Sequence, residues 1–138
     1  MIAINEKEII GAVHNSMYQQ WKLRGYATPV DTLMGIGVLT KQSYEEWRFG
    51  RVPYLEKCCN VNLRKLSVIM HQMRVYARKQ GWKESFCFYK QWGVKKHKNN
   101  IRKLQFSKSG DPGVEKWYAT HFVDTEKVKQ LKEEKSDI

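Results

Sequence analysis

The side chains that could act chemically in this sequence are mainly cations, and they are concentrated in its central part. Residues 57–110 contain 14 lysines and arginines and one acidic residue, Glu84, and so carry a formal charge of +13. The residues before them have six acids and six bases, and those after them have seven acids and five bases, which gives a net charge of +11. Because like charges repel one another in a folded protein, such a concentration is typical of a surface that binds a polyanion. We therefore expect a nucleic acid, DNA or RNA, as the partner.

Two groups of cations in this stretch are candidates for contacts with phosphates. One belongs to a helix that we predict from Asn62 to Gln80, and the other to a loop rich in lysine and asparagine. The helix would suit duplex phosphates and guanine edges, whereas the loop would suit single strands or RNA, and the sequence is compatible with both modes. A basic helix face is often only solvated surface, but the basic neighbours here favour binding. The candidates are Arg64, Lys65, His71, Arg74, Arg78 and Lys79 in the helix, and Lys95, Lys96, Lys98, Arg102 and Lys103 in the loop.

Aromatic residues next to the loop could bind unpaired bases. Exposed rings stack on bases and contribute roughly 1 to 3 kcal/mol per base. Tyr89 and Trp92 are the candidates for base stacking, and Phe88 is their neighbour. A domain of this size also needs large side chains in its core, so we expect at least two of these three rings to be buried.

Signals for metal binding and catalysis are poor. Cys58 and Cys59 are adjacent, and adjacent helical side chains point about 100° apart, so they are badly arranged to share one tetrahedral zinc ion. A metal-dependent nuclease needs a base and carboxylates, but no spacing in the sequence requires such a site. We predict no metal, no cofactor and no catalytic residue, which makes an enzyme the less favoured class. The residues from which a nuclease could be assembled are His121, Asp111, Glu115 and Asp124.

The composition predicts one folded domain. The 138 residues are 41% hydrophobic and 12% aromatic, which supplies enough apolar area for a core despite the high net charge. Three cysteines, two of them adjacent, fit a reducing compartment better than a disulfide framework. No N-terminal signal pattern occurs, and no apolar run approaches the ~18 residues of a membrane span. We expect a cytoplasmic protein without a membrane partner.

Capping residues predict the helices of the N-terminal half. Asn5 begins a first helix, and Thr28 and Thr40 begin two short ones. The short pair surrounds a glycine turn, as in a helix-turn-helix, but neither helix is basic, so plain helical packing is the better interpretation. The longest helix can be capped by Asn60 or Asn62, and Gly81 ends it. Its apolar stripe, which we expect to be buried, consists of Leu63, Leu66, Met70, Met73 and Ala77.

The C-terminal half mixes strand and helix signals. Strand-prone residues near 86–92 and 104–106 favour a two-stranded hairpin, with a short helix at 85–93 as the alternative. Asp111 followed by Pro112 begins a helix. Residues 125–138 are expected to form a helical tail that frays. The apolar face of the helix from Asp111 would include Val114, Trp117, Tyr118, His121 and Phe122.

Three segments of the chain resemble parts of small bacterial proteins that have no assigned function. They are residues 47–56 (WRFGRVPYLE), 106–112 (FSKSGDP) and 118–123 (YATHFV). The resemblance implies a bacterial or mobile-element origin, and it carries no activity, substrate or site.

Together these patterns predict a fold and a function. The fold is a single compact domain over residues 1–124, mainly α with α+β as the alternative, with five or six helices and a small β-hairpin near residues 86–106. The function is non-catalytic nucleic-acid binding through the basic helix and the adjacent loop. The alternative is a protein-interaction module that acts as an adaptor or inhibitor of a nucleic-acid-processing machine, and a small metal-dependent nuclease is the third possibility.

Overall fold

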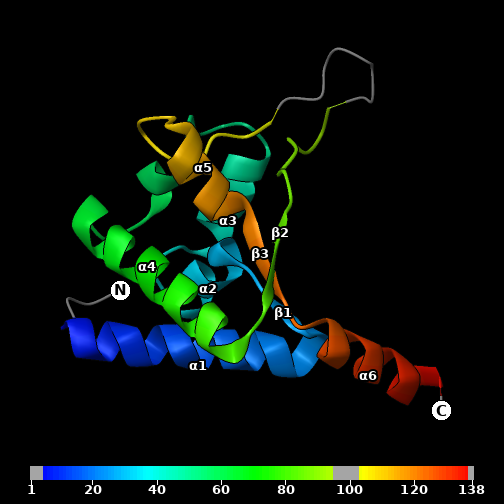
Figure 1. Cartoon of the computed structure of the whole chain (residues 1–138). Helices are drawn as coiled ribbons and strands as arrows, with labels where there is room; N and C mark the ends of the chain where they lie inside the picture. Colours follow the sequence, from blue (N-terminus) through cyan, green and yellow to red (C-terminus); the bar gives the residue numbers. More distant parts are fainter. Residues whose placement is uncertain (1–4, 95–102, 137–138) are drawn as a thin grey trace.

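The computed structural model describes residues 5–94 and 103–136 and shows a mainly helical fold with a small antiparallel sheet (Figure 1). The predicted fold class is thereby confirmed. The helices are α1 (Glu6–Arg24), α2 (Pro29–Gly35), α3 (Lys41–Arg48), the 3-10 helix η1 (Leu55–Cys58), α4 (Leu63–Gln80), α5 (Pro112–Ala119) and α6 (Thr125–Ser136). The strands are β1 (Tyr26–Ala27), β2 (Lys83–Phe86) and β3 (Thr120–Val123).

The helix boundaries follow from local hydrogen bonds at the predicted caps. The side chain of Asn5 accepts a hydrogen bond from Glu8 N at 2.9 Å, and that of Asn62 accepts one from Lys65 N at 2.9 Å. Each bond satisfies a backbone donor that has no partner inside the helix. Thr28, Thr40 and Asp111 cap α2, α3 and α5 in the same way. The predicted starts of these five helices are confirmed.

The core is one cluster of buried residues from α1, α2, α3, η1, α4, α5 and β3, and α2 lies in the middle of the fold between α1 and α5 (Figure 1). Ile9, Val13 and Met17 form the buried stripe of α1. The predicted apolar stripe of α4 is buried from Leu66 to Ala77, but Leu63 is 55% exposed. Within the residues that are described, no helix is long and apolar enough to cross a lipid bilayer.

The sheet differs in its pairing from the predicted hairpin. The strand order is β1-β3-β2, and both outer strands run antiparallel to β3, with Lys83 opposite Val123 and Phe86 opposite Thr120. The two segments of the expected hairpin do meet: Lys90 and Lys103 form an isolated bridge, and the Leu104 N–H donates to the Tyr89 carbonyl at 2.9 Å. The small β element is therefore present, and its central strand comes from farther along the chain.

The helix predicted to include His121 and Phe122 ends earlier than expected. α5 stops at Ala119, and Thr120–Val123 form β3, in which Thr120 and Phe122 are buried. β-Branched and aromatic residues favour a strand, and alternate burial is the period of a strand with one face on the core. The spacing of His121 and Phe122 is compatible with the period of a helix and with that of a strand. Pairing with β1 and β2 selects the strand.

The predicted helical tail is α6, and its first turn is attached to α1. Asp124 accepts hydrogen bonds from Trp21 Nε1 at 2.9 Å and from Lys127 N at 3.2 Å. Gly25 ends α1 in the left-handed conformation, with φ of 81°, and lies against Val128: a Cβ atom there would be 2.6 Å from Val128 Cγ2. Only glycine fits both the backbone conformation and this contact. Fraying of the far end of α6 stays a prediction.

Candidate functional site

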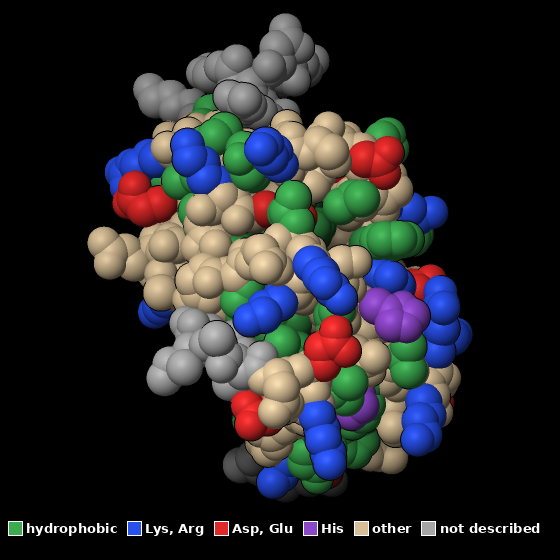
Figure 2. All heavy atoms as spheres, turned by 90° about the vertical axis from the view of Figure 1, so that its left-hand side faces the viewer, with side chains coloured by type: hydrophobic (Ala, Val, Ile, Leu, Met, Phe, Trp, Pro, Cys, Tyr) green, Lys and Arg blue, Asp and Glu red, His purple; other side chains and the backbone are tan. Residues whose placement is uncertain are grey.

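The cations of α4 are spread around the part of the helix that is not buried, and Arg64 and Lys65 line a hollow together with Glu6 and Ile9 of α1. Arg64, His71, Arg78 and Lys79 are exposed, and Lys65 is half-buried. Figure 2 looks onto the side of the molecule that lies at the left of Figure 1, where α4 begins. Lys and Arg side chains are spread over this face, with hydrophobic side chains between them and fewer acidic ones. Arg64, His71 and Arg78 are seven residues apart and so lie along one side of α4. Lys65 and Arg74, nine residues apart, lie on opposite sides of the helix, so the predicted cations of α4 do not all share one face.

These cations have no acidic partner in an ion pair. In residues 5–94 and 103–136, ion pairs join Arg24 to Asp31 at 2.6 Å and Arg51 to Glu46 at 2.8 Å, and none involves α4. α4 itself contains no Asp or Glu. Uncompensated charges on one face create a positive potential that attracts anions.

Arg74 differs from the other cations of α4. Its guanidinium carbon lies 3.9 Å from the centroid of the Trp117 ring in α5, which is a cation–π contact. Burial lowers the pKa of Arg74, Arg78 lowers it further, and Glu84 of β2 acts in the opposite direction. Nη1 of Arg74 is buried and has no hydrogen-bond partner among the described atoms. Arg74 is therefore held between α4 and α5, and only its other nitrogens could reach a phosphate.

Most of the second predicted group lies outside the part of the chain that the structure describes. This applies to Lys95, Lys96, Lys98 and Arg102. Lys103 is described, and its ammonium lies 3.7 Å from the centroid of the exposed Phe88 ring. Of that group, only Lys103 is placed relative to α4.

The two predicted stacking residues have different environments. Tyr89 packs against Trp47 and Phe106, with centroid distances of 5.6 and 5.3 Å, and burial raises the pKa of its hydroxyl. Trp92 is partly exposed, and the Arg48 guanidinium lies 4.7 Å from its ring centroid. The surroundings of Tyr89 are those of a core residue, whereas Trp92 retains an accessible edge. Phe88, the third ring of that group, is 60% exposed, so only Tyr89 packs against the core and the expectation that at least two of the three rings would be buried is wrong. Phe86 and Trp117, which the sequence did not single out for stacking, are also more exposed than Trp92.

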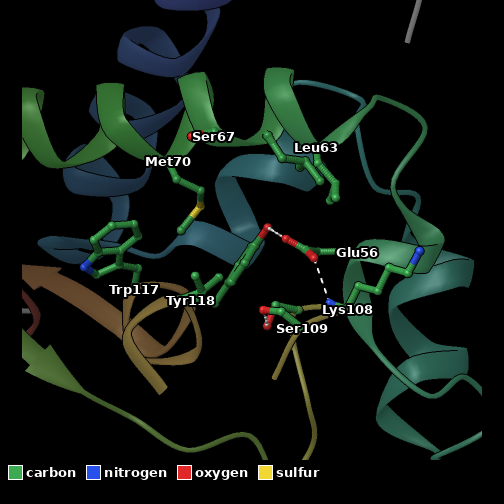
Figure 3. A pocket seen from close by; sticks show the side chains of 11 residues that line it. Glu56, Leu63, Ser67, Met70, Lys108, Ser109, Trp117 and Tyr118 are labelled. Atoms are coloured by element: carbon green, nitrogen blue, oxygen red, sulfur yellow. Dashed lines mark hydrogen bonds between the residues drawn. The ribbon is translucent and has the colours of Figure 1, made fainter. Parts of the chain in front are cut away.

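A cavity of about 510 Å³ lies beside the basic side of α4 (Figure 3). One wall is α4, with Leu63 and Met70, and the other is α5, with Trp117 and Tyr118. At its base, Glu56 accepts hydrogen bonds from Tyr118 Oη at 2.7 Å and from the Lys108 backbone N–H at 2.8 Å. Sequence reasoning missed this cavity because periodicity assigned its lining residues to a filled core.

The residues proposed for a nuclease do not form a metal site. His121 contacts Tyr89 Oη at 3.2 Å, and Asp124 binds Trp21. Asp111 caps α5, and Glu115 accepts hydrogen bonds from the backbone of Phe106 and Ser107. Among the described residues, no group of three or more His, Cys, Asp or Glu side chains could hold a metal ion. Each carboxylate stabilises the local structure instead.

The adjacent cysteines are half-buried thiols, and partial burial raises the pKa of each. Burial raises the pKa of Cys58, and it raises the pKa of Cys59 to about 12, with Cys58 and Glu56 adding to the effect. Metal ligation and nucleophilic attack both require the thiolate. The environment of Cys59 thus opposes either role at neutral pH.

We expect His121 to make stability depend on pH. Burial lowers the pKa of this imidazole from its ordinary value of 6.5, Asp31 opposes the shift, and Arg24 adds to it. The unfolded chain therefore takes up the proton first as the pH falls, so this stabilisation is complete above about pH 6.5 and is lost as the pH drops through the lower folded value. Urea unfolding at pH 7.5 and pH 5 should show a larger loss for the parent than for His121→Gln. An equal loss in both proteins would contradict the assignment to His121.

Comparisons of this chain with protein families, curated proteins and solved structures give no match. The resemblance to small bacterial proteins therefore stays a prediction, and the function is argued from the molecule itself.

Proposed function

We propose that this protein binds nucleic acid without catalysis, through the exposed cations of α4. One observation carries the proposal: Arg64, Lys65, Arg78 and Lys79 lie on one helix that contains no acid, and no ion pair in the described part of the chain neutralises them. Counterions accumulate around such a face in water. Contact with phosphates releases the counterions condensed on the nucleic acid, and this release drives binding. DNA and RNA both satisfy this chemistry.

The salt dependence of binding tests the proposal. The slope of the logarithm of the association constant against the logarithm of the salt concentration depends on the number of neutralised phosphates. Each phosphate contributes about −0.9 to this slope for duplex DNA and about −0.7 for single strands. Arg64, Lys65, Arg78 and Lys79 together therefore predict a slope of about −3 to −4. Fluorescence anisotropy with labelled duplex DNA, single-stranded DNA and RNA from 25 to ~300 mM salt measures it. No binding at low salt, or binding that hardly varies with salt, would refute the proposal.

A charge-matched pair of variants locates the surface. We expect the triple variant Arg64→Ala, Arg78→Ala, Lys79→Ala to bind more weakly and to reduce the slope by about 1 per residue removed. The control removes three exposed cations of α3 and α6, namely Lys41, Lys129 and Lys135, and so has the same net charge. The control should retain a slope close to that of the parent. Equal losses in the two variants would show that overall charge, and not α4, determines binding.

A protein-interaction module is the second candidate, because another surface has the character of an interface. A groove of about 430 Å³ is lined by the exposed rings of Phe86 and Phe88, with Lys116 4.5 Å from the first ring centroid and Lys103 beside the second. An adaptor or inhibitor should retain one protein partner at 1:1 stoichiometry after nuclease treatment. The double variant Phe86→Ser, Phe88→Ser should lose that partner. Loss of every bound protein on nuclease treatment would exclude it.

We also propose the cytoplasm of a bacterium as the location. Cys58, Cys59 and Cys87 are free thiols, which fits a reducing compartment. Labelling of the three thiols in protein extracted under acid quenching would test this, since oxidised cysteines would point to another compartment.

A further inference from the structure

The cavity between α4 and α5 exposes two large apolar residues that the sequence pattern assigns to the core. Leu63 begins the apolar stripe of α4 and is 55% exposed, and Trp117 lies on the apolar face of α5 and is 45% exposed. Both line the same cavity, and they lie toward its opposite ends with Met70 and Tyr118 between them (Figure 3). Apolar surface of this kind gains free energy when a ligand covers it.

We propose that this cavity binds an unpaired nucleobase, while a phosphate next to that base contacts Arg64 and phosphates farther along the strand contact Arg78 and Lys79 at the other end of α4. The inference rests on the proposed function and adds a preference for strands with accessible bases. Base pairs in a duplex keep their bases stacked inside the helix, so an intact duplex cannot fill the cavity. Of the two modes that the sequence left open, duplex binding and single-strand or RNA binding, the inference favours the second.

The size and the walls of the cavity suit a planar base. Its volume of about 510 Å³ is within the range of sites for small ligands. Proteins hold unpaired bases between aromatic and apolar side chains, because the faces of a base are flat and poorly hydrated. Here Leu63 and Met70 on α4 face Trp117 and Tyr118 on α5 across the hollow (Figure 3).

The polar groups around the cavity suit the edges of a base and its phosphates. Ser67 and Ser109 line the cavity and offer hydroxyl groups that can donate or accept. Arg64 directly follows Leu63, and the Lys108 side chain extends alongside η1, away from Trp117 (Figure 3). Both carboxylate oxygens of Glu56 already accept hydrogen bonds, so its charge is partly satisfied within the protein.

The lining has one cation, Lys108, and one acid, Glu56, whose oxygens are already hydrogen-bonded, and Arg64 directly follows Leu63, so the charge around the cavity favours an anionic occupant. An acidic peptide with an apolar anchor would satisfy the same charge, but it would leave the ring of Trp117 without a planar partner. The Arg74 guanidinium covers Trp117 at 3.9 Å and makes the ring part of a stack that a base can extend. A single strand therefore fits both the charge and the shape of the lining.

An abasic strand separates the contribution of the bases to affinity from that of the phosphates. It carries the same phosphates as an ordinary strand of equal length but has no bases. At one salt concentration we expect the parent protein to bind the ordinary single strand about 10-fold more tightly than the abasic one. The variants Leu63→Ser and Trp117→Leu should reduce this ratio to about 1 and leave the salt slope unchanged. Thermal unfolding of both variants checks that they remain folded, and Leu63 is exposed enough to be replaced safely.

The outcomes distinguish this inference from the proposed function. A ratio near 1 in the parent protein with a steep salt slope would overturn the inference and leave the proposed function in place. Absence of binding to either strand would refute both. The triple variant of α4 should bind both strands more weakly, with an unchanged ratio between its affinities for the ordinary and the abasic strand. If an acidic leucine-containing peptide binds the parent but not Leu63→Ser, while the two strands bind equally, the cavity takes a protein segment and the inference is wrong.

Discussion

Replacing Trp47 by alanine is expected to lower the free energy of unfolding by about 4 kcal/mol, within the usual range for removing a buried tryptophan. The Trp47 side chain is completely buried. Its ring centroid lies 5.1 Å from that of Phe106 and 5.6 Å from that of Tyr89, so α3 is joined to the described segments on either side of residues 95–102. Alanine would leave a cavity at the centre of this aromatic cluster.

Trp47 also makes a buried hydrogen bond that a second variant isolates. Its Nε1 donates to the backbone carbonyl of Gln105 at 2.8 Å. Trp47→Phe keeps a ring but removes the donor, and we expect a loss of about 2 kcal/mol from the unpaired carbonyl and the smaller side chain. Urea denaturation followed by far-UV circular dichroism measures both variants. Trp92→Ala, at a partly exposed tryptophan, should lose about 1 kcal/mol or less; a similar loss in Trp47→Ala would contradict the central role of Trp47.

Replacing Glu115 by alanine is expected to cost about 3 kcal/mol. Its two carboxylate oxygens accept hydrogen bonds from the backbone N–H groups of Phe106 and Ser107, at 2.9 and 2.6 Å, and from Ser107 Oγ at 2.6 Å. Phe106 and Ser107 are buried, so alanine would leave their donors without partners. Hydrogen bonds to charged groups contribute about 1.5 to 3 kcal/mol, and an unpaired buried donor costs a similar amount.

Two further variants define the contribution of the Glu115 carboxylate. Glu115→Gln retains an accepting oxygen but directs an N–H₂ group at one of the donors, so we expect it to recover less than half of the loss. Glu134→Ala removes an exposed carboxylate of α6 and should change the free energy of unfolding by less than about 0.5 kcal/mol. Equal stability of Glu115→Ala and Glu134→Ala in urea would show that the loop before α5 is held by other contacts.

The sequence by itself determined where most helices begin and end. A cap such as Asn62 acts on a backbone N–H three residues away, and Gly81 ends the same helix through its own conformation. Such signals lie within one helical turn, so they can be recognised without any knowledge of the fold. The division of α4 into a buried and a basic side follows from the helical period in the same way.

The tertiary structure decided the sheet and the end of α5. His121 and Phe122 suit a helix and a strand equally by spacing, and β3 forms because β1 and β2 supply hydrogen-bond partners from distant parts of the chain. Lys83 pairs with Val123, 40 positions later. Strand pairing is a long-range interaction, so local residue patterns cannot select the partner.

The candidate site also has features that the sequence identified and features that only the structure showed. The sequence identified the cations of α4, because charge and helical period are properties of the residues themselves. Only the structure showed that these cations lack ion-pair partners in its described part, that Arg74 rests on Trp117, and that Leu63 borders a cavity. Burial and pairing depend on which elements pack together, and an apolar residue with a helical period has the same pattern whether or not another element covers it.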